Sequence, residues 1–207
     1  MISLSKEKTL KYLGYFLVIV ISLIILFSSL VLTGLKVMAK NGEIDDLRNV
    51  PIEYVKKMQN GENILKVYNV PDSRVGPESK QYLIKKMRDK LWIDLSKNPK
   101  DKSEVCLLIA DKKIFETVKL IKNKENDDLI SKTLDEAFFH LKESKMMLAE
   151  ENKKDIEIIK IKEKINVAGL AYEDIVKSFD YKNEKINKFI NEIENWNQKN
   201  IQEEKEK

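Results

Sequence analysis

The single histidine, His140, is the side chain best suited to chemistry, because imidazole can act as a general base or as a metal ligand. Nucleophilic and zinc sites need such a histidine to be supported by Cys, Asp or Glu at defined spacing. The segment DEAFFHLKES supplies Glu136, one helical turn before His140. We therefore expect a partly buried structural histidine rather than a metal ligand or a catalytic base.

The single cysteine, Cys106, excludes an intramolecular disulfide. It lies in the apolar stretch VCLLIA, where a small buried side chain is expected. A reactive thiol needs electropositive, partly exposed surroundings, which this stretch does not offer. A chain without disulfides can occupy either side of a membrane, so the cysteine count assigns no compartment.

Other catalytic patterns are missing from the sequence. There is no Walker loop, dinucleotide-binding fingerprint or Cys-x-x-Cys pair, and the six glycines are too scattered to form a phosphate cradle. The acidic pairs at 127–128 and 150–151 fall at expected helix ends, where capping explains them better than acid–base catalysis or calcium binding. The sequence predicts no enzyme, no cofactor and no metal.

Charged residues make up 35% of the chain, but the formal net charge is only +4. Acidic and basic residues are therefore interleaved, as on exposed helix faces. The densest basic run is Lys85, Lys86, Arg88 and Lys90, interrupted by Asp89. It is interpreted as a solvated helix face rather than a phosphate-binding patch, so no nucleic-acid partner is expected.

Residues 12–35 contain no charge. A helix of this length rises roughly 36 Å, against a hydrocarbon core of about 30 Å. The segment therefore predicts a transmembrane helix with the lipid bilayer as its partner. Cleavage after the small residue Ala39 is the alternative, but the apolar run is longer than that of a secretory signal. The closer packing of Lys6, Lys8 and Lys11 favours a cytoplasmic amino terminus and an extracytoplasmic remainder.

Residues 36–76 hold five glycines and prolines and are expected to form a connector, helical around 52–58 and extended around 65–70. A first helix should follow Pro77, and a second and third should be capped by Asn98 and Asn126. Each has an apolar stripe that predicts its buried side. The first stripe is Leu83, Met87, Leu91 and Leu95, joined by Tyr82 and Ile84. The second is Val105, Leu108, Ile109, Ile114 or Phe115, Val118 and Ile121. The third is Ile130, Leu134, Ala137, Phe138, Leu141 and Leu148.

The carboxy-terminal segment has apolar residues spaced alternately by four and three, which is a heptad pattern. A helix is favoured over a strand at its start, residues 155–162. The pattern predicts a long amphipathic helix that packs on the chain's own helices or, alternatively, associates with a partner helix or a second copy. The candidate interaction residues are Tyr172, Ile175, Phe179, Ile186, Phe189, Ile193 and Trp196.

The stretches PESKQYLIKKMRD (77–89) and NPKDKSEVCLLIADKKIFE (98–116) resemble the prokaryotic domain of unknown function numbered 5667 over roughly residues 70 to 150. The matching positions are Pro77, Ser79, Tyr82, Lys85 and Lys86, then Pro99, Lys102, Ala110, Asp111, Lys112, Lys113 and Glu116. Lys80 and Gln81 depart from the pattern of this family. The resemblance implies a helical hairpin, often behind an amino-terminal membrane helix, and implies no activity or cofactor.

These observations predict an all-α protein with an amino-terminal transmembrane helix, a helical hairpin or bundle and a long heptad-patterned helix. The expected regions are a cytoplasmic tail (1–11), the transmembrane helix (12–35), the connector (36–76), the helical domain (77–150), the amphipathic helix (151–200) and a frayed tail (201–207). The expected function is a single-pass, extracytoplasmic interaction or structural module without catalysis. The alternative is a membrane-tethered regulatory or sensory component that acts through helix association.

Overall fold

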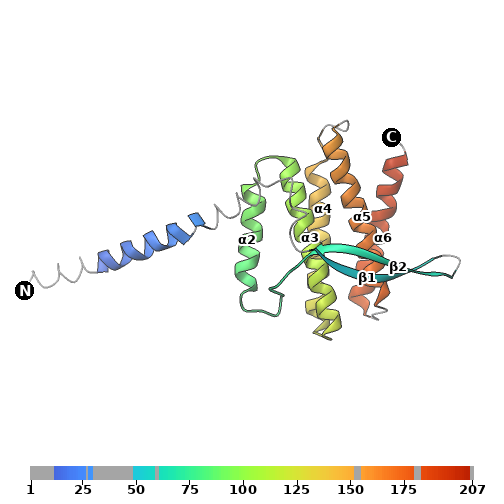
Figure 1. The fold of residues 1–207 in the computed structure, drawn as a ribbon, viewed down its shortest axis with the longest axis horizontal. Helices are drawn as coiled ribbons and strands as arrows, with labels where there is room; N and C mark the ends of the chain where they lie inside the picture. The colour runs from blue at the N-terminus through green and yellow to red at the C-terminus, as the bar shows by residue number, and fades with distance from the viewer. Residues whose placement is uncertain are drawn as a thin grey trace, which may run out of the picture. The chain divides into compact units, whose positions relative to one another are not determined.

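The computed structural model of the chain describes residues 12–26, 28–29, 49–58, 61–151, 155–179 and 183–205. The chain divides into two compact units, Met1–Asp46 and Leu47–Lys207. The second unit contains the elements described below, and Figure 1 shows its long helices side by side with a β-hairpin lying across them.

The predicted all-α fold is wrong in one respect, because the second unit also contains a small antiparallel sheet. The elements follow the order β1 (Asn49–Lys57), β2 (Asn63–Pro71), α2 (Tyr82–Leu95), α3 (Pro99–Lys122), α4 (Asp127–Met147), α5 (Ile156–Ser178) and α6 (Glu184–Lys205). Helices α3 and α4 form the most extensive helix pair, and the hairpin packs on α3 and α5 (Figure 1).

The transmembrane helix predicted at residues 12–35 is also corrected. The helix there is described at residues 12–26 and 28–29. Across the residues that the structure describes, no helix has both the length and the apolar character needed to cross a membrane. Residues 27 and 30–35 of the predicted span, and the tail at 1–11, lie outside the described residues.

Part of the predicted connector forms the β-hairpin. Ile52 pairs with Tyr68 and Val50 with Val70, and these side chains share the face that packs on the helices. The expected helix at 52–58 is therefore a strand, whereas the expected extended segment at 65–70 is confirmed. Gly61, in the turn, has a φ of +84°, a value that glycine adopts without steric cost.

The predicted caps of α3 and α4 are both confirmed. The Asn98 side chain accepts a hydrogen bond from the backbone N–H of Asp101, and Asn126 accepts one from Asp128. The apolar stripes predicted for these two helices are buried, with Leu134 and Leu141 fully inaccessible. Side-chain oxygens satisfy N–H groups that the first helical turn leaves unpaired, which is why these two boundaries follow from local sequence.

The long carboxy-terminal helix predicted for 151–200 is two helices, since α5 ends at Ser178 and α6 begins at Glu184. The helix expected at 155–162 is confirmed from Ile156 onwards, and α6 continues through the predicted frayed tail to Lys205. The two helices pack closely at Gly169, where an added Cβ would lie 2.5 Å from Trp196 and from Asn197. Residues 152–154, 180–182 and 206–207 lie outside the described residues.

Candidate functional site

Helix α2 has the opposite orientation to the one its sequence predicts. Its buried residues are Lys85 and Asp89, whereas Leu83, Ile84 and Met87 are 68%, 66% and 58% exposed. The predicted burial of the Leu83–Met87 stripe is therefore wrong. The cause is a set of charged partners on the neighbouring helices, which stabilises the polar side of α2 in a buried position.

Six side chains form a polar cluster between α2, α3 and α4, named the buried polar cluster because all but Tyr82 and Glu136, which are half-buried, are buried: Ser73, Tyr82, Lys85, Lys113, Glu116 and Glu136. At its centre, Lys85 of α2 forms an ion pair with Glu116 of α3. The Ser73 hydroxyl donates to Glu116 Oε1 over 2.6 Å and accepts from Lys85. Buried charges need this pairing, because an unpaired ion away from water is strongly unfavourable.

The Tyr82 hydroxyl extends the cluster to the next helix. It donates to Glu116 Oε2 over 3.1 Å and accepts from Lys113, whose Nζ also lies 2.5 Å from Glu136 Oε2. Lys86 reaches the other oxygen of Glu136 over 2.8 Å. Helix α2 is therefore connected to α4 as well as to α3.

Burial and neighbouring charges shift the pKa values of this cluster in both directions. Burial lowers the pKa of Lys85 to about 7; Asp89 opposes this shift, and Lys113 adds to it. Burial alone would raise the pKa of Glu136, but hydrogen bonds from Lys113 and Lys86 outweigh it and lower that pKa to about 2. Glu136 is consequently ionised throughout the physiological range and can balance both lysines.

A second buried polar group connects the hairpin to α5. Asp111 of α3 accepts hydrogen bonds from the hydroxyls of Tyr68 (2.8 Å) and Tyr172 (2.7 Å), whose rings pack edge to face. Burial raises the pKa of Asp111 to about 6 although both hydrogen bonds favour its ionised form. Tyr172, a residue of the predicted seam, thus has an internal role.

These two groups give a physical meaning to the residues that carry the family resemblance. Tyr82, Lys85 and Lys86 from its first stretch contact Lys113, Glu116 or Glu136, and Asp111 binds the two tyrosines. The basic run at 85–90 is therefore only partly the solvated face that the sequence predicts, because Lys85 is buried. The spacing within α2 could not reveal this, since the partners lie on other helices.

The side of α2 opposite the cluster forms an apolar surface, the outer face, made of Leu83, Ile84 and Met87. Lys86 and Lys90 are exposed along one border of it, and Arg88, which stacks on Trp92, lies on the other. The outer face is therefore apolar with basic edges.

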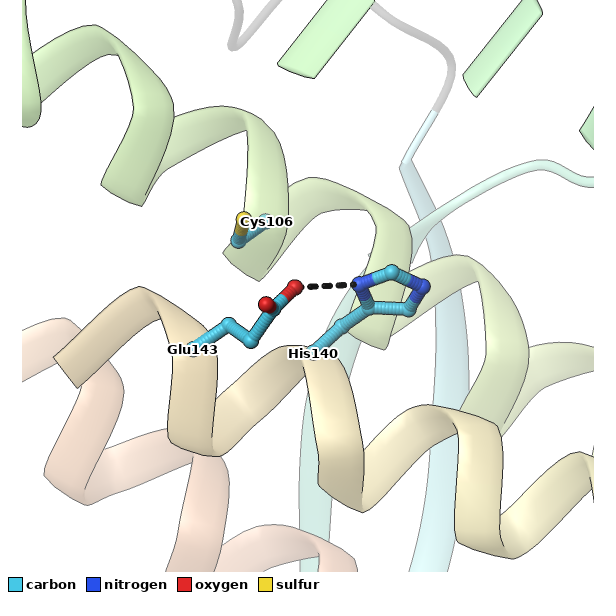
Figure 2. A group of neighbouring side chains, drawn as sticks. All are labelled: Cys106, His140 and Glu143. Atoms are coloured by element: carbon cyan, nitrogen blue, oxygen red, sulfur yellow. Dashed lines mark ion pairs between the residues drawn. The ribbon is translucent and has the colours of Figure 1, made fainter. Parts of the chain in front are cut away.

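A third group of side chains lies between α3 and α4 (Figure 2). Cys106 extends from α3, while His140 and Glu143 come from successive turns of α4, and their potential ligand atoms all lie within 4.8 Å of one another. The expected burial of Cys106 and partial burial of His140 are confirmed. Glu143 was not predicted to join His140, although a carboxylate three residues after a histidine on a helix is a local signal for such a pair.

The candidate interaction residues of the carboxy-terminal segment lie in the chain's own core or pack against it. Tyr172, Ile175, Ile186, Phe189 and Ile193 are buried, and Phe179 and Trp196 are partly buried against them. Phe138 of α4 contacts the rings of both Phe189 and Trp196 edge to face. This placement favours the first of the two alternatives, packing on the chain's own helices.

Comparison with known proteins agrees with the resemblance of the α2–α3 region. No curated protein and no solved structure matches the chain. The family model described as Domain of unknown function (DUF5667) matches residues 74–168, from just before α2 to the middle of α5. The predicted resemblance to that family is thereby confirmed for this segment, which contains most of the buried polar cluster and all of the outer face of α2.

Proposed function

We propose that the chain is a non-catalytic protein-interaction module, and that the outer face of α2 docks an amphipathic helix of another protein. The observation that carries this proposal is the exposure of Leu83, Ile84 and Met87 on a helix whose polar side is buried. A groove or helix face of this kind is a common way to bind an amphipathic helix, through contacts repeating every three or four residues.

The charges around the outer face support a partner with acidic flanks. Lys90 is exposed along one edge, next to Lys86, which pairs with Glu136, and Arg88, which pairs with Asp89, lies along the other. Asp94 is an exposed acid near the carboxy-terminal end of the same face. Complementary charge steers association and rejects partners with basic flanks. The occupant we commit to is therefore an apolar helix bordered by Asp or Glu.

The absence of catalysis is part of the proposal. The acids and bases of the buried polar cluster are engaged with one another, and Lys85 and Glu116 are almost inaccessible to solvent. Because these groups neutralise one another, they stabilise α2 and fix its orientation. The outer face of α2 needs that fixed orientation to bind a partner.

Photo-crosslinking in the producing cell tests the proposal. A photoreactive residue at Met87 should crosslink to a helical segment of another protein with apolar residues at i, i+3 and i+4 and acidic flanks. The same probe at Val167 of α5, which is 57% exposed, is the matched control and should give no such product. Charge reversal by Lys90→Glu, at an exposed lysine, should reduce the Met87 crosslink at least threefold.

Two results would contradict the proposal. One is a Met87 product that contains only a second copy of this chain, because the outer face would then be a self-association surface. The other is a crosslinked segment without acidic flanks whose yield the Lys90→Glu reversal leaves unchanged.

A further inference from the structure

The group formed by Cys106, His140 and Glu143 offers one sulfur, one nitrogen and one oxygen donor on two adjacent helices (Figure 2). His140 and Glu143 are spaced i, i+3 on α4, so both side chains extend from the same side of that helix. Cys106 faces them from α3, the most extensive packing partner of α4. The position of the three donors is therefore fixed by the core of the fold rather than by a loop.

The His140 ring contains a buried nitrogen atom, Nδ1, that lacks the hydrogen bond expected of a buried polar atom in the part of the chain that the structure describes. This nitrogen is inaccessible to solvent. Glu143 Oε2 lies 3.5 Å from it, which is longer than a typical N–H···O hydrogen bond. Buried polar atoms are normally paired, so a ring nitrogen that holds no hydrogen bond and faces a carboxylate is in a suitable position to bind a metal ion.

A neutral imidazole nitrogen carries a lone pair and is the form that binds metals. The Glu143 carboxylate beside the ring supplies a second ligand atom, and the Cys106 sulfur a third.

The distance between the two donors fits a tetrahedral ion. Zinc binds histidine nitrogen and carboxylate oxygen at about 2.0–2.2 Å, so two such ligands at the tetrahedral angle lie roughly 3.4 Å apart. The observed separation of His140 Nδ1 and Glu143 Oε2 is 3.5 Å. The Cys106 sulfur is the third protein ligand. With a Zn–S bond of about 2.3 Å, the sulfur should lie roughly 3.6 Å from each of the other two donor atoms. The three ligand atoms lie within 4.8 Å of one another, so a small side-chain adjustment brings the sulfur to that distance.

We propose that Cys106, His140 and Glu143 bind a divalent transition-metal ion of the zinc class, with a water molecule in the fourth position. A sulfur donor excludes magnesium and calcium, which prefer oxygen ligands alone. On binding, the Cys106 thiol releases its proton to solvent and coordinates as thiolate, so one proton leaves for each ion bound. The metal approaches from the side of His140 and Glu143, whose side chains are 19% and 29% exposed, while the sulfur is covered behind them.

The competing explanation is structural. Cys106 is completely buried, and burial raises the pKa of its thiol to about 12, as for a small apolar residue in a core. That explanation accounts for the cysteine alone and leaves the buried Nδ1 of His140 without a partner. Metal binding accounts for all three side chains together.

The test uses the purified full-length chain after removal of metals with a chelator. Titration with Zn²⁺ against a chromophoric competitor should give one tight site per chain. Co²⁺ in place of Zn²⁺ should give a tetrahedral spectrum with a thiolate-to-metal charge-transfer band. Cys106→Ser, His140→Gln and Glu143→Gln should each weaken zinc affinity at least tenfold, and Cys106→Ser should abolish the charge-transfer band.

Glu150→Gln, which changes an exposed carboxylate beyond the end of α4, is the matched control and should leave zinc affinity unchanged. Circular dichroism of each metal-free variant identifies any variant that fails to fold. Cys106→Ser changes the side-chain volume very little, so it tests the proposal even if another variant does not fold. Wild-type affinity no greater than that of Cys106→Ser, or a cobalt complex without a thiolate band, would overturn the proposal. Neither result would affect the outer face of α2, so the two proposals fail independently.

Discussion

The Tyr82 hydroxyl of α2 lies 3.1 Å from Glu116 Oε2 of α3, in a region where Lys85 also forms an ion pair with Glu116. Two polar residues of α2 thus converge on one buried carboxylate. This convergence explains why α2 buries its charged side and exposes its apolar residues. The same contacts that stabilise the α2–α3 pair therefore create the outer face on which the proposed function depends.

Removing the central carboxylate should destabilise the fold strongly. Glu116→Gln leaves Lys85 buried without its counter-charge, and we expect a loss of about 3–5 kcal/mol in the free energy of unfolding, measured with denaturant. The double variant Lys85→Met with Glu116→Leu should recover most of that loss, because no unpaired charge remains. Glu157→Gln, which breaks an exposed ion pair with Lys100, is the control and should cost less than about 1 kcal/mol. A Glu116→Gln variant as stable as this control would show that the cluster does not hold α2.

Asp111 should give the fold a characteristic pH dependence. The pKa of Asp111 is about 6 in the folded chain, whereas the ordinary value, which applies to the unfolded chain, is 3.8. The folded state therefore binds the proton more tightly than the unfolded state does. The free energy of unfolding should therefore fall as pH rises from about 4 to about 6, by about 3 kcal/mol from this group.

Asp111→Asn tests that expectation, because an amide oxygen can still accept hydrogen bonds from Tyr68 and Tyr172 but carries no charge. The variant should match the wild type near pH 4 and be more stable by up to about 3 kcal/mol at pH 7. Denaturant unfolding at several pH values provides the difference curve. A difference between the two proteins that stays constant from pH 4 to pH 7 would mean that Asp111 does not titrate in this window.

The parts of the fold that follow from local sequence were predicted correctly. Asn98 and Asn126 cap the helices that follow them, and the apolar periodicity of α3 and α4 identifies the sides they bury. These features depend on residues within one or two helical turns. Strand β1 was not predicted although it has a local signal, since Val50, Ile52 and Tyr54 alternate with the more exposed side chains between them.

The features that depend on distant partners were not predicted. The burial of Lys85 requires Glu116, 31 residues later, and the neighbourhood of Cys106 and His140 requires the relative register of α3 and α4. No spacing within one helix encodes these contacts. For the same reason, the heptad pattern of α5 and α6 could not decide between an internal core and an external partner. The predicted extracytoplasmic location stays a prediction, which a carboxy-terminal reporter fusion would test.

The contact between α5 and α6 should depend on the small size of Gly169. An added Cβ would meet Trp196 and Asn197 at 2.5 Å, and the Asn197 side chain donates to the Gly169 carbonyl over 3.1 Å. Overpacking typically costs 1–3 kcal/mol, whereas replacing a helical glycine by alanine gains about 0.5–1 kcal/mol. We therefore expect Gly169→Ala to lower the free energy of unfolding by about 1–2 kcal/mol. Val167→Ala, at an exposed position of the same helix, is the control and should change the free energy of unfolding by less than about 0.5 kcal/mol. A Gly169→Ala variant more stable than the wild type would contradict the close approach of α5 and α6.

The orientation of α2 is tested most directly by the free energy of unfolding of Leu83→Ala beside that of Leu134→Ala. Leu134 is fully buried, so its truncation should cost about 2–5 kcal/mol. Leu83 is 68% exposed, so the same truncation there should cost less than about 0.5 kcal/mol. A loss of 2 kcal/mol or more in Leu83→Ala would mean that the apolar side of α2 is buried, and that the chain has no outer face on which a partner could dock.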